Sequence, residues 1–475
     1  MEVRIDRRPL WIILLIKGLR PLAFLGIALV CWHIVSTAPP EGLTPAGRNA
    51  IAIFIVCLFL WITNILPLAV TGIFAIIMVP LFGVLTERET FALFGNDAVF
   101  FILGAFILSG AVMHSGLSRR VALFIMGRAG NSPKGLVRAI FLLAALLSCI
   151  MSEHAVAAML FPMVLEIAQG LKLRPGRSSY GKLLFISLAW GCIIGGVATF
   201  LGGARVPLAV GILKETVGES IGFFEYSLAV FPVVVVMLFI AYHVLVRVFP
   251  IDVEETGYAS DILTKRLHDL GRMSYTEYAV GAIMAVTVLA WVFLGRSIGL
   301  ASISLASVVL LFILKLVRWK DIEEYVNWGI ILMYGGAIIL GKALGESGAA
   351  EWMADRTIGA WATSPWAVIA LLSLTTLVLT EGISNAAVIA ILMPVGIGMA
   401  SRFGLNPVTV TFAIAVPAGL AFALPMSTPA NAIAVSSGYV RVLDMVKAGL
   451  FMGITAWIVF NLVARFYWPV IGMGF

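Results

Sequence analysis

Apolar stretches of about 20 residues succeed one another along almost the whole sequence. A helix needs roughly 20 mostly apolar residues to cross the hydrocarbon core of a bilayer. Eleven stretches meet this requirement, at about 19–38, 48–66, 67–84, 94–115, 183–202, 226–248, 276–295, 299–317, 328–345, 408–425 and 445–468. The sequence therefore predicts an all-α polytopic membrane protein with about 11 transmembrane helices.

The composition favours this class and excludes others. Of the 475 residues, 61% are hydrophobic and only 12% are charged, whereas soluble domains carry about 25% charged residues. So many apolar side chains cannot all be buried in one core, and much of the surface must face lipid. Cytosolic enzymes and nucleic-acid-binding proteins are excluded. The four cysteines lie in apolar stretches without CxxC spacing, which indicates neither a disulfide framework nor a thiolate metal site.

Two further apolar stretches, 136–170 and 366–402, are too long for one helix, and polar residues interrupt each of them centrally. Re-entrant hairpins explain both features, because non-helical backbone at membrane depth is tolerated where it is buried in protein or lines a polar cavity. Basic residues flank 136–170 on both sides, so we expect this hairpin to open to the cytoplasm and 366–402 to open outward. The same rule places the basic N-terminus in the cytoplasm. We expect the membrane to be a bacterial inner (plasma) membrane.

The two halves of the chain resemble each other at a constant shift of 232 residues. The shift pairs 104–108 with 336–340, Gly116 with Gly348, Ser152 with Ser384, Ala155 with Ala387, Pro162 with Pro394 and Pro175 with Pro407. Because the two hairpins are expected to enter from opposite faces, the halves are predicted to be inverted repeats. Their polar tips should then meet near the middle of the membrane.

The repeat divides the chain into four predicted parts. An N-terminal segment with the first span occupies 1–45, and the first repeat occupies 46–250. A hydrophilic cytoplasmic connector follows at 251–275, and the second repeat occupies 276–475.

The hairpin tips and two later helix breaks are the candidate site. Polar atoms in hydrocarbon are costly, so polar clusters between apolar half-helices indicate function. Hydroxyl and amide groups at the start of a half-helix can bind an anion, and unwound segments expose the carbonyl ligands of Na⁺. The expected substrate-binding residues are Ser152, Glu153, His154, Arg205, Ser384, Asn385, Thr428 and Pro429. The expected ion-binding residues are Ser152, Thr199, Gly202, Ser384, Ala386, Thr428 and Asn431.

These motifs resemble the divalent anion:sodium symporter family of the ion transporter superfamily. The segments 379–387, 392–394, 423–433 and 437–439 are similar to its second half, and 94–120 is similar to its first half. The resemblance covers about 45–470. It implies an elevator-type homodimer in which each protomer has a scaffold domain and a mobile transport domain that contains both hairpins. It also implies di- and tricarboxylates or sulfate as substrates, usually carried with Na⁺.

The first tip departs from the family pattern. Sodium-coupled members carry Ser-Asn-Thr at both tips, whereas this chain has Glu153 and His154 after the first serine and Ala386 in the second tip. A glutamate there would repel a dicarboxylate unless it is protonated or neutralised, and Arg205 and His154 are the nearest candidates. In one interpretation, Arg205 or protonated His154 is a fixed cation in place of the first Na⁺. In another, Glu153 carries a proton or binds a substrate amino group while Arg205 binds its acidic part. In a third, Glu153 and Arg205 form a purely structural pair.

We therefore expect a secondary active transporter of small, C4-dicarboxylate-like divalent organic anions that works by alternating access. Na⁺ coupling should be altered or lost at the first site. An H⁺-coupled or exchange carrier of sulfate, a sulfonate or an amino acid-like anion is an alternative, as is an anion channel. An enzyme is not expected, because three consecutive tip residues cannot align a nucleophile, a base and an orienting group. Membrane lipid and a second copy of the chain are the expected partners. No cofactor is expected beyond Na⁺ or H⁺.

Overall fold

The structure is a computed structural model that describes residues 26, 29, 32–128, 132–356 and 364–474. Most of the predicted first span, 19–38, lies outside the described residues, as does the basic N-terminal segment whose cytoplasmic location the sequence predicts.

The described residues form helices and no strands. Nine helical segments in this part of the chain are long and apolar enough to cross a membrane. They are α2 (Pro45–Thr63), α4 with α5 (Glu87–Phe94 and Asp97–His114), α9 (Ser179–Val197), α11 (Phe223–Val248), α13 (Tyr275–Ile298), α16 (Trp328–Glu346), α18 (Pro365–Gly382), α19 (Asn385–Phe403) and α22 (Val442–Phe466). The prediction of an all-α polytopic membrane protein is confirmed.

Other α-helices complete the fold. They are α3 (Leu68–Leu81), α6 (Leu117–Gly127), α7 (Pro133–Ser148), α8 (Glu153–Gly170), α10 (Arg205–Val217), α12 (Gly257–Asp269), α14 (Leu300–Ile313), α15 (Trp319–Ile322), α17 (Ala349–Arg356), α20 (Pro407–Ala415) and α21 (Pro429–Ser436). Short 3₁₀ turns are η1 (Glu323–Tyr325), η3 (Pro417–Gly419) and η4 (Trp468–Ile471).

Helix boundaries reproduce the internal repeat. The first residues of α3 and α14 are 232 positions apart, and the same shift relates α4 to α15, α6 to α17, α7 to α18 and α8 to α19. Equivalent local signals produce this agreement: Ser132 and Ser364 accept hydrogen bonds from backbone amides at the starts of α7 and α18, and a proline follows each serine. The register is lost after the hairpins, where the two breaks differ in length.

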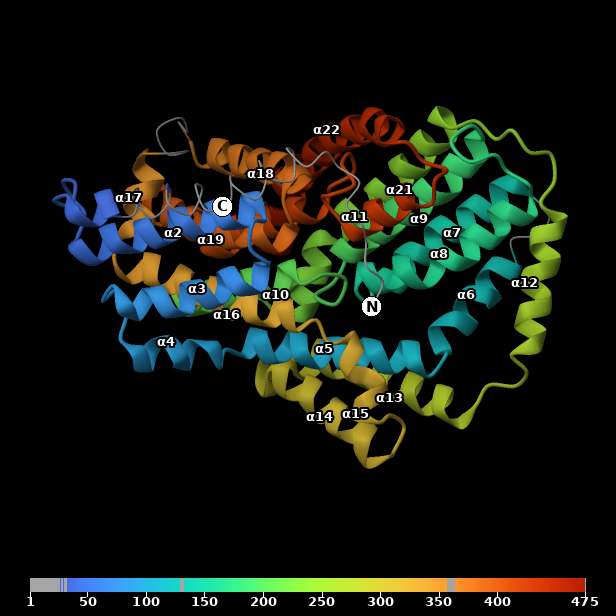
Figure 1. The fold of residues 1–475 in the computed structure, drawn as a ribbon, viewed down its shortest axis with the longest axis horizontal. Helices are drawn as coiled ribbons and strands as arrows, with labels where there is room; N and C mark the ends of the chain where they lie inside the picture. The colour runs from blue at the N-terminus through green and yellow to red at the C-terminus, as the bar shows by residue number, and fades with distance from the viewer. Residues whose placement is uncertain (1–25, 27–28, 30–31, 129–131, 357–363, 475) are drawn as a thin grey trace, which may run out of the picture.

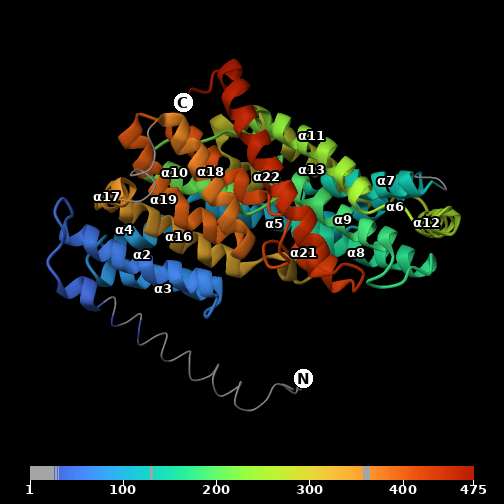
Figure 2. The same ribbon diagram turned by 90° about the horizontal axis from the view of Figure 1, so that it is seen from above.

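The long helices run roughly along the long axis of the molecule (Figure 1). The first hairpin, α7 and α8, lies toward one end, and α19 of the second hairpin lies toward the other. Figure 2 shows the same separation from above, with α12 at one end and α4 and α17 at the other. Between the ends, α10 packs against α5, α16, α19 and α20.

Three details differ from the sequence-based expectations. The predicted continuous span 408–425 is wrong, because α20 ends at Ala415 and only the short turn η3 follows. Proline in this turn lacks an amide hydrogen and cannot continue the helical ladder. The connector 251–275 contains the helix α12, which crosses the ends of other helices in Figure 1. Neither α10 nor α21 was expected, because each is short and directly follows a break.

Candidate functional site

The two hairpin tips have the same local construction. In the first, α7 ends at Ser148 and α8 begins at Glu153; in the second, α18 ends at Gly382 and α19 begins one residue after Ser384. The hydroxyl of Ser152 accepts a hydrogen bond from the amide of Ala155 at 3.3 Å, and that of Ser384 accepts one from Ala387 at 3.3 Å. Both serines are therefore helix N-caps, and each fixes the start of its half-helix.

The first break, between α9 and α10, lies against the first tip. The hydroxyl of Thr199 donates to the carbonyl of Cys149 at 2.6 Å. The amide of Glu153 donates to the carbonyl of Gly202 at 2.9 Å. The break thus faces its own hairpin, and the Thr199 hydroxyl and the Gly202 carbonyl already form hydrogen bonds to that hairpin.

A buried ion pair fills the first tip. Arg205 Nη1 lies 3.4 Å from Glu153 Oε2, and each side chain is only 1% exposed. His154 Nδ1 lies 3.9 Å from the other carboxylate oxygen, but the His154 side chain is 47% exposed. Arg205 is therefore the partner that neutralises Glu153, and His154 is the member of this cluster that solvent or a ligand reaches.

The guanidinium of Arg205 connects the two repeats. A Cβ added to Gly203, in the first break, or to Gly419, in η3 of the second repeat, would overlap it. The remaining nitrogens Nε and Nη2 are buried and have no hydrogen-bond partner among the described residues. Buried donors without partners are costly, so these two nitrogens are candidates for a bound group.

The second break runs from the end of α20 to the start of α21. Thr428 caps α21 by accepting the amide of Asn431 at 3.2 Å. The side-chain nitrogen of Asn431 donates to the carbonyls of Ala421 (3.1 Å) and Leu424 (3.3 Å) and to the hydroxyl of Ser427 (3.2 Å). Its Oδ1 atom is buried and has no partner among the described residues. An oxygen of this kind is a candidate cation ligand.

Two residues at the second tip were missed by the sequence reasoning. The hydroxyl of Thr380 donates to Asn385 Oδ1 at 2.9 Å and to the carbonyl of Ala418 at 2.8 Å. The carboxylate of Glu381 accepts backbone amides of the second break. Their position in an otherwise apolar helix was the available signal, because isolated polar groups at membrane depth need a partner.

The predicted residues are thus brought into two clusters. Glu153, Arg205 and His154 gather at the first tip and break, whereas Asn385 and Asn431 belong to the second tip and break. Two predicted residues contribute less to these clusters: Pro429 is exposed at the start of α21, and Ala386 has no side-chain oxygen.

The two breaks are neighbours, and each helix that follows a break packs against the other repeat's hairpin. The rings of Trp190 in α9 and Phe422 in the second break are 5.4 Å apart. Of the two helices after the breaks, α10 packs against α19 and α21 packs against α8.

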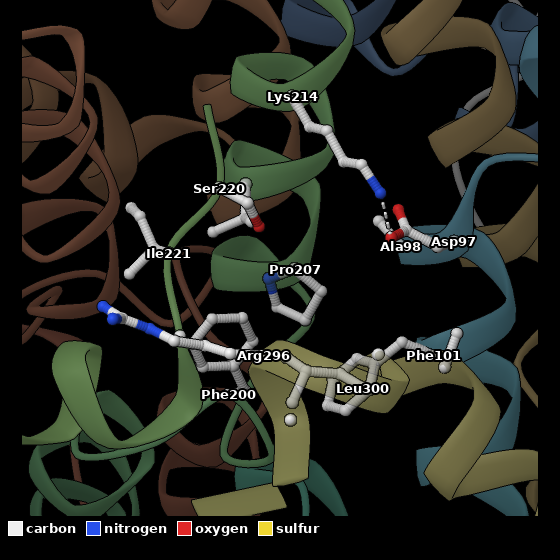
Figure 3. A pocket seen from close by; sticks show the side chains of 15 residues that line it. Asp97, Ala98, Phe101, Phe200, Pro207, Lys214, Ser220, Ile221, Arg296 and Leu300 are labelled. Carbon is white, nitrogen blue, oxygen red and sulfur yellow. Dashed lines mark hydrogen bonds and ion pairs between the residues drawn. The ribbon is translucent and has the colours of Figure 1, made fainter. Parts of the chain in front are cut away.

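A separate cavity of about 250 Å³ lies between α5, α10 and the α13–α14 pair (Figure 3). Lys214 of α10 forms an ion pair with Asp97 of α5 at its edge, with a nitrogen-to-oxygen distance of 2.5 Å. The neighbouring Glu215 is also held, because its side chain accepts from Asn96 at 2.6 Å and its carbonyl accepts from Lys342 of α16 at 2.7 Å. These contacts join the end of α10 to both α5 and α16.

A family model described as the sodium:sulfate symporter transmembrane region matches residues 20–474. The chain belongs to this symporter family. The resemblance to the divalent anion:sodium symporters is therefore confirmed, and this symporter-family protein is a membrane transporter and not an enzyme.

Curated relatives of this symporter-family chain span nearly its whole length. The sodium-dependent dicarboxylate transporter SdcS of Staphylococcus saprophyticus is 26% identical over 456 residues, which cover 90% of this chain and 88% of the relative. The protein of the same name from Staphylococcus aureus strain NCTC 8325 is 27% identical over 479 residues, which cover 95% and 91%.

Two solved transporters share the fold of this family member. Neisseria gonorrhoeae MtrF, described in a study of antimetabolite efflux pumps, superposes with a TM-score of 0.58 at 14% identity, covering 93% of this chain and 97% of MtrF. The YdaH transporter of Alcanivorax borkumensis gives a TM-score of 0.54 at 15% identity, covering 89% and 99%.

Proposed function

We propose that the chain is a secondary active carrier of C4-dicarboxylate-like divalent organic anions in which Arg205 takes the place of one Na⁺. The observation that carries this proposal is the buried pair of Arg205 with Glu153 at the first tip, in which two further guanidinium nitrogens have no partner in the part of the chain that the structure describes. A fixed guanidinium supplies the positive charge that a bound Na⁺ would supply, without needing to be taken up from solution.

The second break supports a retained Na⁺ site. The oxygen of Asn431, which has no partner among the described residues, lies in the first turn of α21, directly after the non-helical backbone of 420–428. Unwound segments of this kind supply Na⁺ ligands in transporters. The carrier should therefore bind one Na⁺ at the second site. The substrate class is supported by the relatives named sodium-dependent dicarboxylate transporters and by the half-helices that begin at both tips, because the N-terminal end of a helix attracts anions.

An access path is favoured by the exposed faces of two helices that pack together. On α8 the exposed residues near the tip are His154, Ala158 and Pro162, and on α21 they are Pro429, Ala432 and Ser436. Lipid-facing positions elsewhere carry large apolar side chains such as Phe239 and Phe293. Small and polar residues at exposed positions favour water over lipid, so we infer that this face is the vestibule to the substrate site.

The mechanism proposed is an elevator with inverted repeats at 46–250 and 276–475, joined by the connector 251–275. The mobile transport domain would consist of both hairpins together with α9 to α11 and α20 to α22. The scaffold would consist of α2 to α5 and α13 to α16, and it would dimerise with the scaffold of a second copy of the chain. The basic segments favour a cytoplasmic location for the N-terminus and the mouth of the first hairpin.

Uptake by reconstituted protein tests the proposal. Liposomes containing unlabelled succinate are supplied with labelled succinate in Na⁺, in choline, or with an inward pH gradient. We expect saturable uptake that rises with Na⁺ with a Hill coefficient of about 1, because a single Na⁺ site remains. A Hill coefficient near 2 would contradict replacement of Na⁺ by Arg205.

Uptake whose rate does not depend on Na⁺ but requires internal anion or a proton gradient would establish exchange or H⁺ coupling instead. Competition by sulfate, sulfonates and amino acids defines the substrate class.

The contacts at the end of α10 should bias the access equilibrium if α10 moves against α5 and α16. Lys214 and Asp97 are each about half exposed, with side-chain exposures of 44% and 48%. A pair of this kind contributes about 0.2–1 kcal/mol, so Lys214→Met should change the equilibrium constant between the present state and the other access state by about 1.4-fold to fivefold. The measurement is the alkylation rate of Ala158→Cys in the proposed vestibule, which should fall in the Lys214→Met background.

Arg318→Met is the matched control, because Arg318, the N-cap residue of α15, pairs with Asp321 of that helix and not with a residue of α10. An unchanged alkylation rate in the Lys214→Met variant would show that the pair does not bias access.

A further inference from the structure

The carboxylate of Glu381 binds three consecutive backbone amides of the second break. Its Oε1 atom accepts from Phe422 at 2.8 Å and from Ala423 at 3.0 Å. Its Oε2 atom accepts from Ala423 at 3.1 Å and from Leu424 at 2.9 Å. Successive amides that converge on one anion form a nest, and hydrogen bonds to a carboxylate are stronger than those between neutral groups. The tip of the second hairpin thus holds the second break in one conformation.

The carbonyls around this nest determine the orientation of a neighbouring amide. Ala421, directly before the three amides, and Leu424, the last of them, both offer their carbonyls to the side-chain nitrogen of Asn431. Asn431 is fully buried. Because its nitrogen is held by two carbonyls, its oxygen is the atom left without a partner among the residues that the structure describes.

We propose that Glu381 is a positioning residue for cation binding: by fixing the 421–424 backbone, it keeps Asn431 oriented with its oxygen, not its nitrogen, toward the cation. This inference rests on the proposed function, because it concerns the Na⁺ site retained in the second repeat. Glu381 itself does not contact the ion. Its effect is transmitted through two sets of hydrogen bonds, as with the outer partners that orient ligands at metal sites.

Replacing Glu381 by glutamine would change the hydrogen bonds of the nest. Glu381→Gln preserves size but replaces one carboxylate oxygen by an NH₂ group, which then faces amide donors and cannot accept from them. The nest loses part of its acceptors, and the Ala421 and Leu424 carbonyls are no longer fixed. The Asn431 amide can then turn its NH₂ group toward the site, where it repels a cation.

Na⁺ activation of succinate uptake tests the inference. For Glu381→Gln we expect the Na⁺ concentration for half-maximal uptake to rise about tenfold, with the rate at saturating Na⁺ within about twofold of wild type. A role confined to folding would lower the rate at every Na⁺ concentration without moving the midpoint, and that result would overturn the inference. The matched control is Glu351→Gln, because Glu351 is exposed on α17 and accepts from the Ser401 hydroxyl at 2.9 Å.

Amide hydrogen exchange provides a readout independent of transport. In Glu381→Gln, exchange should accelerate in a peptide covering 420–426 and remain unchanged in one covering the first break, 198–204. Unchanged exchange at 420–426 would overturn the inference. A wild-type protein that Na⁺ does not activate would refute the proposed function itself, whereas an activated wild type with an unshifted Glu381→Gln midpoint would refute only the role of Glu381.

Discussion

Arg205→Gln is expected to lower the free energy of unfolding by about 3–5 kcal/mol and to reduce anion uptake on the order of 100-fold. The substitution leaves the Glu153 carboxylate buried, at 1% exposure, without its cationic partner. An uncompensated buried charge is far more costly than the net contribution of the pair it came from. The lone carboxylate would also repel an incoming dicarboxylate at the first tip. Thermal unfolding in detergent and uptake into proteoliposomes measure the two effects.

A double variant separates a structural pair from a fixed cation. Glu153→Gln with Arg205→Met removes both charges, so most of the lost stability should return. Uptake should nevertheless stay at least about tenfold below wild type, because the guanidinium proposed to take the place of Na⁺ is gone. Recovery of both stability and uptake would show that the pair only holds the first tip together. Arg318→Gln serves as the control and should change neither quantity measurably, because the Arg318 side chain is 85% exposed in its pair with Asp321.

Gly419→Ala is expected to reduce uptake about tenfold and to destabilise the fold by about 1–3 kcal/mol. A Cβ at this position would lie 2.5 Å from Cζ and 2.7 Å from Nη2 of Arg205. The guanidinium would have to move, yet its position is fixed by Glu153 and by Gly203 on another side. The methyl group would therefore disturb the first tip from the second repeat. Initial uptake rates and the unfolding temperature are the measurements.

Gly382→Ala and Gly453→Ala are matched controls for this prediction. An added Cβ at either position meets nothing within 4 Å. Both variants should retain wild-type uptake, since alanine also favours the helical conformation over glycine. If Gly419→Ala behaved like these controls, the close contact between the second break and Arg205 would have no role in transport.

Much of the fold was predictable because its signals are local. The lengths of the apolar stretches predicted the long helices. Ser152 and Ser384, whose hydroxyls can cap a helix, indicated the tips where two helices meet. The internal repeat was predictable for the same reason, because equivalent caps and prolines start equivalent helices, as in α7 and α18. The span 408–425 was mispredicted because a hydropathy window averages over Pro417 and the irregular backbone that follows it. Apolar character persists there although the helix does not.

The sequence alone determined that the chain is a membrane protein, where its tips and breaks lie, and that Glu153 and Arg205 are candidate site residues. This was possible because hydropathy, capping and charge are properties of short segments. Only the tertiary structure decided the pairings, because these contacts depend on how each break folds back onto a hairpin. Glu153 and Arg205 are 52 residues apart, and Glu381 reaches amides 41 to 43 residues away. The contact of Arg205 with Gly419 joins the two repeats. Within the described ranges the Asn431 oxygen has no partner, because the carbonyls around this side chain hold its amide nitrogen instead.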